Sequence, residues 1–304
     1  MKRYEPALGF SIPCAAMGCM RIADMELGAL EALMETAIEG GMNFFDHADF
    51  YGNHLSETRF GEVLKHNPSL RAKMLIQSKC GIRNGFYDSS YEHIVASAEN
   101  SLRKLNVEYL DALLIHRPDA LVEPEEVARA FGDLEKAGKV RYFGVSNHNP
   151  MQIEVLKQAV GQKLLFNQMQ MSLVHTGMLD QGINVNTDFP GAVDRDGGVL
   201  EYCKLHQMVL QVWSPFQHGF IEGVFLDHPD FPDVNRKLDE LSEKYGVTKT
   251  AMAVAWLLRI PMMIQVIAGT TNPSRVKEII SGADTVLSRE DWYALYRSAG
   301  NTLP

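Results

Sequence analysis

Eight short apolar runs, separated by stretches with a helical pattern, constrain what this chain can fold into more than any other feature. Short apolar runs that alternate with helices are typical of a mainly parallel sheet covered by helices. The runs lie near residues 14–18, 43–45, 74–77, 110–115, 140–145, 164–167, 208–213 and 264–267. Eight such units in 304 residues favour a closed (β/α)8 barrel, the TIM barrel, over an open doubly wound sheet.

Two further observations support this fold. No G-x-G-x-x-G motif opens a helix, which weakens the dinucleotide-binding doubly wound alternative. Residues 4–13 contain Pro6, Gly9 and Pro13 and predict a short β-hairpin that caps the barrel. The sequence therefore predicts an α/β protein with a (β/α)8 TIM barrel, a short N-terminal β-hairpin cap and one domain over residues 1–304.

Several helix ends are indicated by capping residues. Ser89-Ser90 is a plausible N-cap, and Asn149-Pro150 and Asn272-Pro273 each place a capping side chain before a proline at the first helical position. Gly138 and Gly161 fall where helices should stop. The least patterned segments, about 172–198 and 216–231, follow strand ends, and we expect them to be long functional loops.

The charge and the cysteines exclude several classes of protein. The net charge is −9 and no block of Lys or Arg stands out, which argues against nucleic acid or an anionic membrane as the main partner. No run of 18 or more apolar residues and no signal-peptide pattern are present. The four cysteines have no metal-site or disulfide spacing. We therefore expect a cytoplasmic protein with no metal site.

Four chemically reactive side chains stand at or just after predicted strand ends. Asp46 directly follows the run at 43–45, Tyr51 lies in the next turn, and Lys79 and His116 come just after the third and fourth runs. Because the carboxyl ends of all barrel strands lie on one face, these four residues should converge there. The sequence therefore predicts an active site built from residues that are distant along the chain.

The chemistry of the four residues is consistent with acid catalysis. Asp46 would be the counter-charge that keeps a buried Lys79 ionised. Lys79 within about 4–6 Å of Tyr51 should lower the pKa of the phenol, so that Tyr51 becomes a usable general acid. His116 would donate a hydrogen bond that orients a carbonyl. Reduction of that carbonyl also needs a hydride, which a cofactor must supply.

Other strand ends suggest where that cofactor would bind. Ser146, Asn147 and Gln168 have donors and acceptors suited to a carboxamide, and Trp213 offers a flat face for a nicotinamide ring. The helix that begins at Asn272-Pro273 would favour an anion at its N-terminus, where Arg275 could bind a phosphate.

Less specific interpretations remain for each residue taken alone. Asp46 could cap the next helix, His116 could be a core histidine, Lys79 a surface lysine and Trp213 a packing residue. A hydrolase-type metal site is a further alternative, with ligands from the following set: His47, Asp49, His54 and His116. No strand carries a His-x-His pair, and such a site would leave Tyr51 and Lys79 without a role.

A family resemblance joins these motifs. The segments that carry it are Phe45-Asp46-His47-Ala48-Asp49-Phe50-Tyr51-Gly52, Ser78-Lys79-Cys80-Gly81, Leu114-Ile115-His116-Arg117-Pro118-Asp119, Gly144-Val145-Ser146-Asn147, Asn167-Gln168 and Trp213-Ser214-Pro215. In this order they resemble the aldo-keto reductase family, most closely its bacterial YdhF-like branch. The resemblance implies a barrel that reduces carbonyl compounds with NADPH.

The resemblance also implies residue roles. The catalytic set would be Asp46, Tyr51, Lys79 and His116, with Tyr51 as proton donor. The cofactor-binding set would comprise Cys19, Met20, Arg21, Ser146, Asn147, Gln168, Trp213, Ser214, Phe216, Gly219, Gly269, Thr270, Thr271 and Arg275. Trp213 would stack on the nicotinamide, and the last four residues would bind the 2′-phosphate. Gly269 and Ile279 stand where many relatives have Lys and Asn, so fewer adenosine contacts are expected.

The predicted function is therefore NADPH-dependent reduction of aldehydes or ketones to alcohols. An NADPH-binding regulatory module with slow chemistry, as in the channel β subunits of the same family, is the alternative. The partner would be a small carbonyl compound. The cofactor would be NADPH or NADP+. The sequence does not identify that compound, and both a monomer and a dimer stay open.

Overall fold

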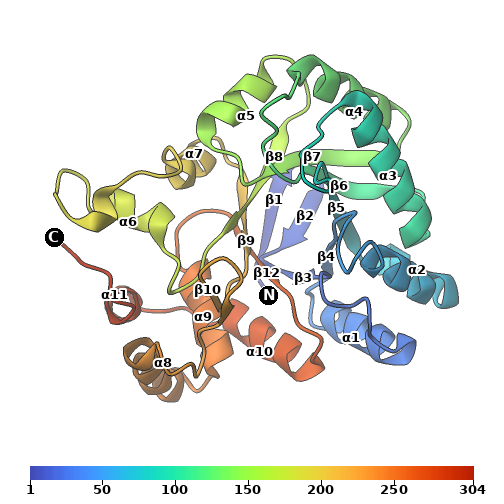
Figure 1. Cartoon of the computed structure of the whole chain (residues 1–304). Coiled ribbons are helices and arrows are strands. Elements are labelled where there is room, and N and C mark those ends of the chain that lie inside the picture. Colours follow the sequence, from blue (N-terminus) through green and yellow to red (C-terminus); the bar gives the residue numbers. More distant parts are fainter.

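A closed barrel of eight parallel strands forms the centre of the molecule in a computed structural model that describes residues 1–304 (Figure 1). The strands follow the order β12-β3-β4-β5-β6-β7-β8-β9 around the ring. Their bounds are β3 Ala15–Gly18, β4 Phe44–Asp46, β5 Leu75–Cys80, β6 Leu110–Ile115, β7 Val140–Ser146, β8 Leu164–Gln170, β9 Val209–Trp213 and β12 Ile264–Ala268. Each predicted apolar run is one of these strands, and the predicted (β/α)8 barrel is confirmed.

Helices connect the strands and cover the outside of the barrel (Figure 1). Their bounds are α1 Leu27–Glu39, α2 Ser56–His66, α3 Tyr91–Leu105, α4 Pro124–Lys136, α5 Pro150–Lys157, α6 Gly177–Ile183, α7 Val199–Leu205, α8 Pro232–Tyr245, α9 Lys249–Leu258, α10 Pro273–Ala283 and α11 Arg289–Ser298. Short 3-10 helices add Pro68–Lys73 and Pro190–Ala192.

Capping chemistry explains where several helices begin. The side chains of Ser90, Asn149 and Asn272 accept hydrogen bonds from backbone N–H groups in the first turns of α3, α5 and α10, as predicted. Gly138 follows α4 with φ of +69°, a conformation that glycine adopts at low cost. The prediction for Gly161 is wrong, because α5 already ends at Lys157.

The two segments expected to be long functional loops contain short regular elements. Residues 172–198 include α6 and the 3-10 helix Pro190–Ala192. Residues 216–231 include a small antiparallel pair, β10 Gln217–His218 and β11 Gly223–Val224. Both segments are long connections that follow strand ends, and the sequence did not indicate the short elements within them.

Two apolar cores stabilise the barrel. A large cluster fills the layer between the strands and the helices, and a smaller one occupies the interior. The antiparallel hairpin of β1 Arg3–Ala7 and β2 Phe10–Pro13 contributes Tyr4, Phe10 and Ile12 to the interior cluster. Phe10 stacks on Tyr142 at 4.0 Å between ring centroids. The predicted hairpin therefore closes the end of the barrel at which the strands begin.

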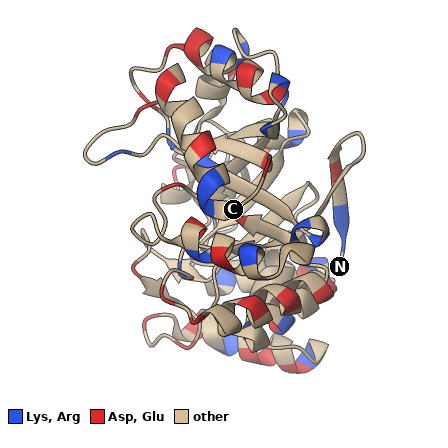
Figure 2. Cartoon of the chain, turned by 90° about the vertical axis from the view of Figure 1, so that its right-hand side faces the viewer, with Lys and Arg blue, Asp and Glu red and all other residues tan.

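The surface of the barrel carries both signs of charge. Figure 2 shows Lys and Arg interspersed with Asp and Glu over the helices of one face. None of the helices is long and apolar enough to span a lipid bilayer. All four cysteines are buried and free, so the fold depends on no disulfide.

Candidate active site

A buried ion pair lies at the carboxyl end of the barrel. Asp46 ends β4 and Lys79 is the penultimate residue of β5, and Lys79 Nζ lies 2.8 and 2.9 Å from the two carboxylate oxygens. Lys79 Nζ also donates to the His47 carbonyl at 2.7 Å. Burial is the largest single influence and lowers the pKa of Lys79, but the charges and hydrogen bonds of Asp46 and Tyr51 together outweigh it and raise this pKa above its usual value. Lys79 is therefore a permanent buried cation.

Tyr51 is in direct contact with this cation. Its hydroxyl lies 3.1 Å from Lys79 Nζ, because the turn after β4 brings the side chain back over the strand end. Burial is the largest influence on the pKa of Tyr51 and raises it above the usual value, although Lys79 lowers it. Asp46 raises it further. The predicted net lowering of the Tyr51 pKa is therefore wrong: the phenol remains protonated at neutral pH.

His116 completes the cluster just after β6. Its ring lies 5.9 Å from the Tyr51 ring and 5.2 Å from the Phe50 ring, measured between centroids. Burial first, and then the charges of Lys79 and Arg117, lower the pKa of His116 well below its usual value. The imidazole is therefore neutral and has one N–H to donate. Its Nδ1 atom has no hydrogen-bond partner.

A chain of buried glutamines crosses the barrel interior and ends on Asp46. Asp46 Oδ1 accepts hydrogen bonds from Gln77 Nε2 at 2.6 Å and Gln168 Nε2 at 3.1 Å. Gln211 joins both of these amides to Gln265, which donates to the Pro13 carbonyl at 2.7 Å. We call the four amides Gln77, Gln168, Gln211 and Gln265 the glutamine network. It fixes the orientation of the Asp46 carboxylate from the interior of the barrel.

Three predicted cofactor residues are also fixed by internal hydrogen bonds. Asn147 has a left-handed backbone with φ of +59°, which directs its amide back toward the strand ends. Its Nδ2 donates to Ser146 Oγ at 2.8 Å and to the His116 carbonyl at 3.2 Å. Its Oδ1 accepts from Trp213 Nε1 at 3.1 Å. This hydrogen bond gives the indole of Trp213 a defined orientation.

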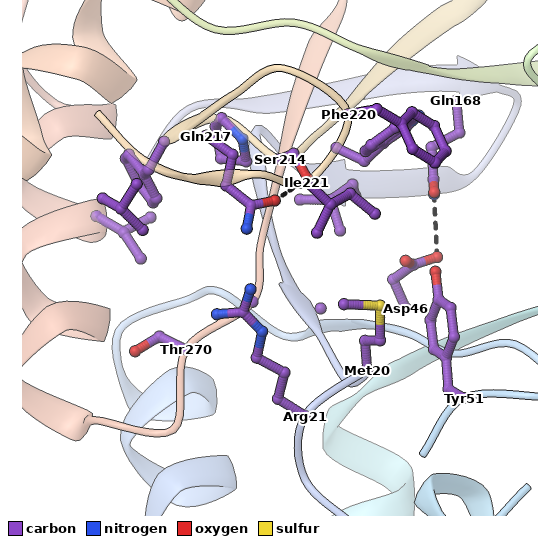
Figure 3. Close-up of a pocket in the computed structure, with 18 of the residues that line it drawn as sticks. Met20, Arg21, Asp46, Tyr51, Gln168, Ser214, Gln217, Phe220, Ile221 and Thr270 are labelled. Carbon is purple, nitrogen blue, oxygen red and sulfur yellow. Dashed lines mark hydrogen bonds between the residues drawn. The ribbon is translucent and has the colours of Figure 1, made fainter. Parts of the chain in front are cut away.

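A large cavity opens above these residues. Its volume is about 870 Å³, and it reaches from Tyr51 and His116 across the barrel face to Arg275 in the first turn of α10. Figure 3 shows Ser214, Gln217, Phe220 and Ile221 on one side and Met20, Arg21 and Thr270 on the other. Asp46 and Tyr51 lie next to each other at one end, with Gln168 bonded to Asp46 (Figure 3).

Comparison with known proteins identifies the family. The sequence profile described as "Aldo/keto reductase family" matches residues 16–298. The chain belongs to the aldo/keto reductase family. The oxidoreductase YdhF of Escherichia coli is 33% identical over 93% of this chain and 92% of the relative. The 6-dehydroglucose reductase of Agrobacterium fabrum is 32% identical over 91% of this chain and 90% of the relative.

Solved structures agree on the fold. An aldo-keto reductase from Klebsiella pneumoniae in complex with NADPH superimposes with a TM-score of 0.77, covering 97% of this chain and 93% of that one. The two are 22% identical, so this likeness concerns the fold alone. The resemblance inferred from the motifs, including that to YdhF, is confirmed. The chain is therefore an oxidoreductase of the aldo/keto reductase family.

Most residues predicted to bind the cofactor line the cavity of this aldo/keto reductase. They are Met20, Arg21, Ser146, Asn147, Gln168, Trp213, Ser214, Phe216, Gly269, Thr270 and Arg275. Cys19, Gly219 and Thr271 do not line it. Cys19 is fully buried, and the Gly219 carbonyl accepts a hydrogen bond from Gln170 Nε2 at 2.7 Å. No cluster of three or more His, Cys, Asp or Glu side chains suited to a metal ion is present.

The sequence interpretation missed two groups of residues. The first comprises Gln77, Gln211 and Gln265, all fully buried within barrel strands, and the last two interrupt strands that are otherwise apolar. A glutamine in the middle of a buried strand was the signal that could have revealed them, because a buried amide requires hydrogen-bond partners. The second comprises Phe220 and Ile221, which line the cavity from a loop whose course the sequence does not indicate.

Proposed function

We propose that this protein reduces aldehydes or ketones to alcohols, with NADPH as hydride donor and Tyr51 as proton donor. The observation that carries the proposal is the contact of Tyr51 Oη with Lys79 Nζ at 3.1 Å, at the end of a cavity of about 870 Å³. A protonated phenol beside a buried cation is suited to giving a proton to an oxygen that gains negative charge.

The residues of the cavity fit a nicotinamide dinucleotide. Arg21 and Arg275 line it without an ion-pair partner within 4.0 Å, so both are available for phosphate groups. Arg275 lies in the first turn of α10, where the helix dipole also favours an anion. Ser146, Asn147 and Gln168 provide polar atoms for the carboxamide. When bound, a reduced nicotinamide supplies the hydride that the carbonyl carbon receives.

The protein's own residues would control the proton. Because burial keeps the pKa of Tyr51 high, the phenol carries its proton at neutral pH and can donate it through Oη. Lys79 then stabilises the phenolate that remains, and Asp46 keeps Lys79 charged. The neutral imidazole of His116 can donate a hydrogen bond that orients the substrate oxygen. Each role uses an atom that already lies in the cluster.

Tyr51→Phe tests the proposal. Loss of the general acid should lower kcat by about 10²–10⁴-fold with an aromatic aldehyde, followed by NADPH absorbance. The NADPH dissociation constant, measured by fluorescence titration, should change little. Tyr87→Phe is the matched control, because Tyr87 lines the same cavity but is not part of the cluster. Full activity in Tyr51→Phe would exclude the mechanism.

The regulatory module left open by the sequence makes a different prediction. Such a protein would bind NADPH but oxidise it slowly or not at all. Stopped-flow mixing of the NADPH-loaded protein with a panel of reactive aldehydes separates the two functions. Rapid oxidation of bound NADPH by any aldehyde favours the reductase, and no oxidation favours the module.

A further inference from the structure

Arg117 is a cation in the cavity that no protein group neutralises. It directly follows His116 at the end of β6 and lines the cavity. No carboxylate lies within 4.0 Å of it, and its guanidinium carbon lies 5.8 Å from the Phe220 ring centroid. The nearby Asp119 carboxylate accepts from the backbone N–H groups of Ser89 and Leu121 instead. A half-buried, unpaired arginine in a cavity is available to a ligand.

The barrel topology separates Arg117 from the proposed phosphate sites. Three strands lie between β6 and β12 in either direction around the ring, so the two strands are opposite each other. Gly269, Thr270 and Arg275 follow β12, whereas Arg117 follows β6 together with His116. A dinucleotide whose phosphates lie near Arg275 would therefore not reach Arg117 with those phosphates. Arg117 lies instead beside Tyr51 and His116, at the end of the cavity that we call the catalytic side.

The other charges on the catalytic side are already paired. Asp46 and Lys79 neutralise each other, and the histidine is uncharged. The remaining neighbours at this end are mainly apolar or aromatic, namely Phe50, Ile82, Tyr87 and Phe220. An uncompensated positive charge against apolar walls favours a negatively charged ligand, and the planar guanidinium fork matches carboxylate and phosphate oxygens.

We propose that Arg117 binds an acidic group of the substrate, so that the preferred substrates are aldehydes or ketones bearing a carboxylate, sulfonate or phosphate. This inference rests on the proposed carbonyl reduction and names its substrate class. Arg117 would fix the acidic end of the molecule while Tyr51 and His116 contact the carbonyl oxygen. Phe220, on whose ring the guanidinium lies, would cover the non-polar part of the substrate.

Two aldehydes that differ in one charge test the inference. 4-Carboxybenzaldehyde and methyl 4-formylbenzoate present the same aromatic aldehyde with and without an anion. Wild-type protein should have a higher kcat/KM for the acid, 4-carboxybenzaldehyde, than for the ester. Arg117→Met should lower the preference about 10- to 100-fold, mainly through KM for the acid, because a charge-assisted hydrogen bond is lost. Arg117→Lys should restore part of it, and Arg83→Met, which removes a cation paired with Asp88, should have no effect.

A binding measurement gives a second readout that does not depend on turnover. Benzoate titrated into the NADP+-loaded protein by calorimetry should bind wild type and not Arg117→Met, whereas benzamide should not distinguish them. If neither aldehyde is reduced, the proposed function fails, and the benzoate titration still decides the role of Arg117. Two results would overturn the inference. One is equal binding of benzoate by wild type and Arg117→Met. The other is a loss of kcat/KM in Arg117→Met that is as large for neutral D-glyceraldehyde as for 4-carboxybenzaldehyde.

Discussion

Gln211→Leu is the most direct test of the glutamine network. The Gln211 side chain accepts from Gln77 Nε2 at 2.9 Å and Gln168 Nε2 at 3.0 Å. It donates to Gln77 Oε1 at 3.0 Å and Gln265 Oε1 at 2.8 Å. Leucine has a similar volume but makes none of these hydrogen bonds, so the substitution removes the central member of a fully buried network.

The expected cost follows from the groups left without partners. The oxygens Oε1 of Gln77 and Gln265 would each lose their hydrogen bond, and the amides of Gln77 and Gln168 would each lose one donor contact while retaining Asp46. A buried polar atom without a partner costs about 1–3 kcal/mol. The two oxygens and two donor contacts together predict that the free energy of unfolding falls by roughly 4 kcal/mol. This is a large part of the roughly 5–15 kcal/mol that is typical of a folded protein.

Equilibrium unfolding in guanidinium chloride, followed by tryptophan fluorescence and far-ultraviolet circular dichroism, measures this loss. The midpoint should fall while the denaturant slope stays constant, since the fold itself is unchanged. Gln158→Leu is the control, because Gln158 is exposed after α5, and it should change stability by less than about 0.5 kcal/mol. A loss below about 1 kcal/mol in Gln211→Leu would refute the argument that the network stabilises the barrel.

Two further predictions concern the cofactor and the pH dependence of stability. Arg275→Ala should raise the dissociation constant for NADPH by about tenfold or more and that for NADH much less, because only NADPH has a 2′-phosphate; fluorescence titration that gave equal effects would remove this assignment. Burial lowers the pKa of His47 from 6.5 to about 3, so between these values the unfolded chain binds a proton that the folded chain does not, and stability falls as the pH falls. His47→Leu should reduce the change in the free energy of unfolding with pH, by at most about 1.4 kcal/mol per pH unit, in unfolding curves measured from pH 7 to 4.5. An unchanged pH dependence would contradict the lowered pKa of His47.

Local patterns predicted much of the fold. The eight strands are short apolar runs, and Ser90, Asn149 and Asn272 begin helices through hydrogen bonds within one turn of the chain. These features depend on residues close in sequence, which a single sequence displays directly. The expectation that strand ends converge needed only one additional fact, that parallel strands present their carboxyl ends on one face.

The sequence alone determined the barrel, and it indicated which polar side chains stand at the strand ends. Only the tertiary structure decided the electrostatics of the cluster. Tyr51 has a raised pKa because burial by many surrounding groups outweighs its one favourable contact with Lys79. Gln77 and Gln211 meet although 134 positions separate them, and Arg117 is identified as unpaired only once all its neighbours are known. The burial and the hydrogen bonds of a side chain depend on all the residues that surround it. Those residues come from distant parts of the sequence and meet only after the chain has folded.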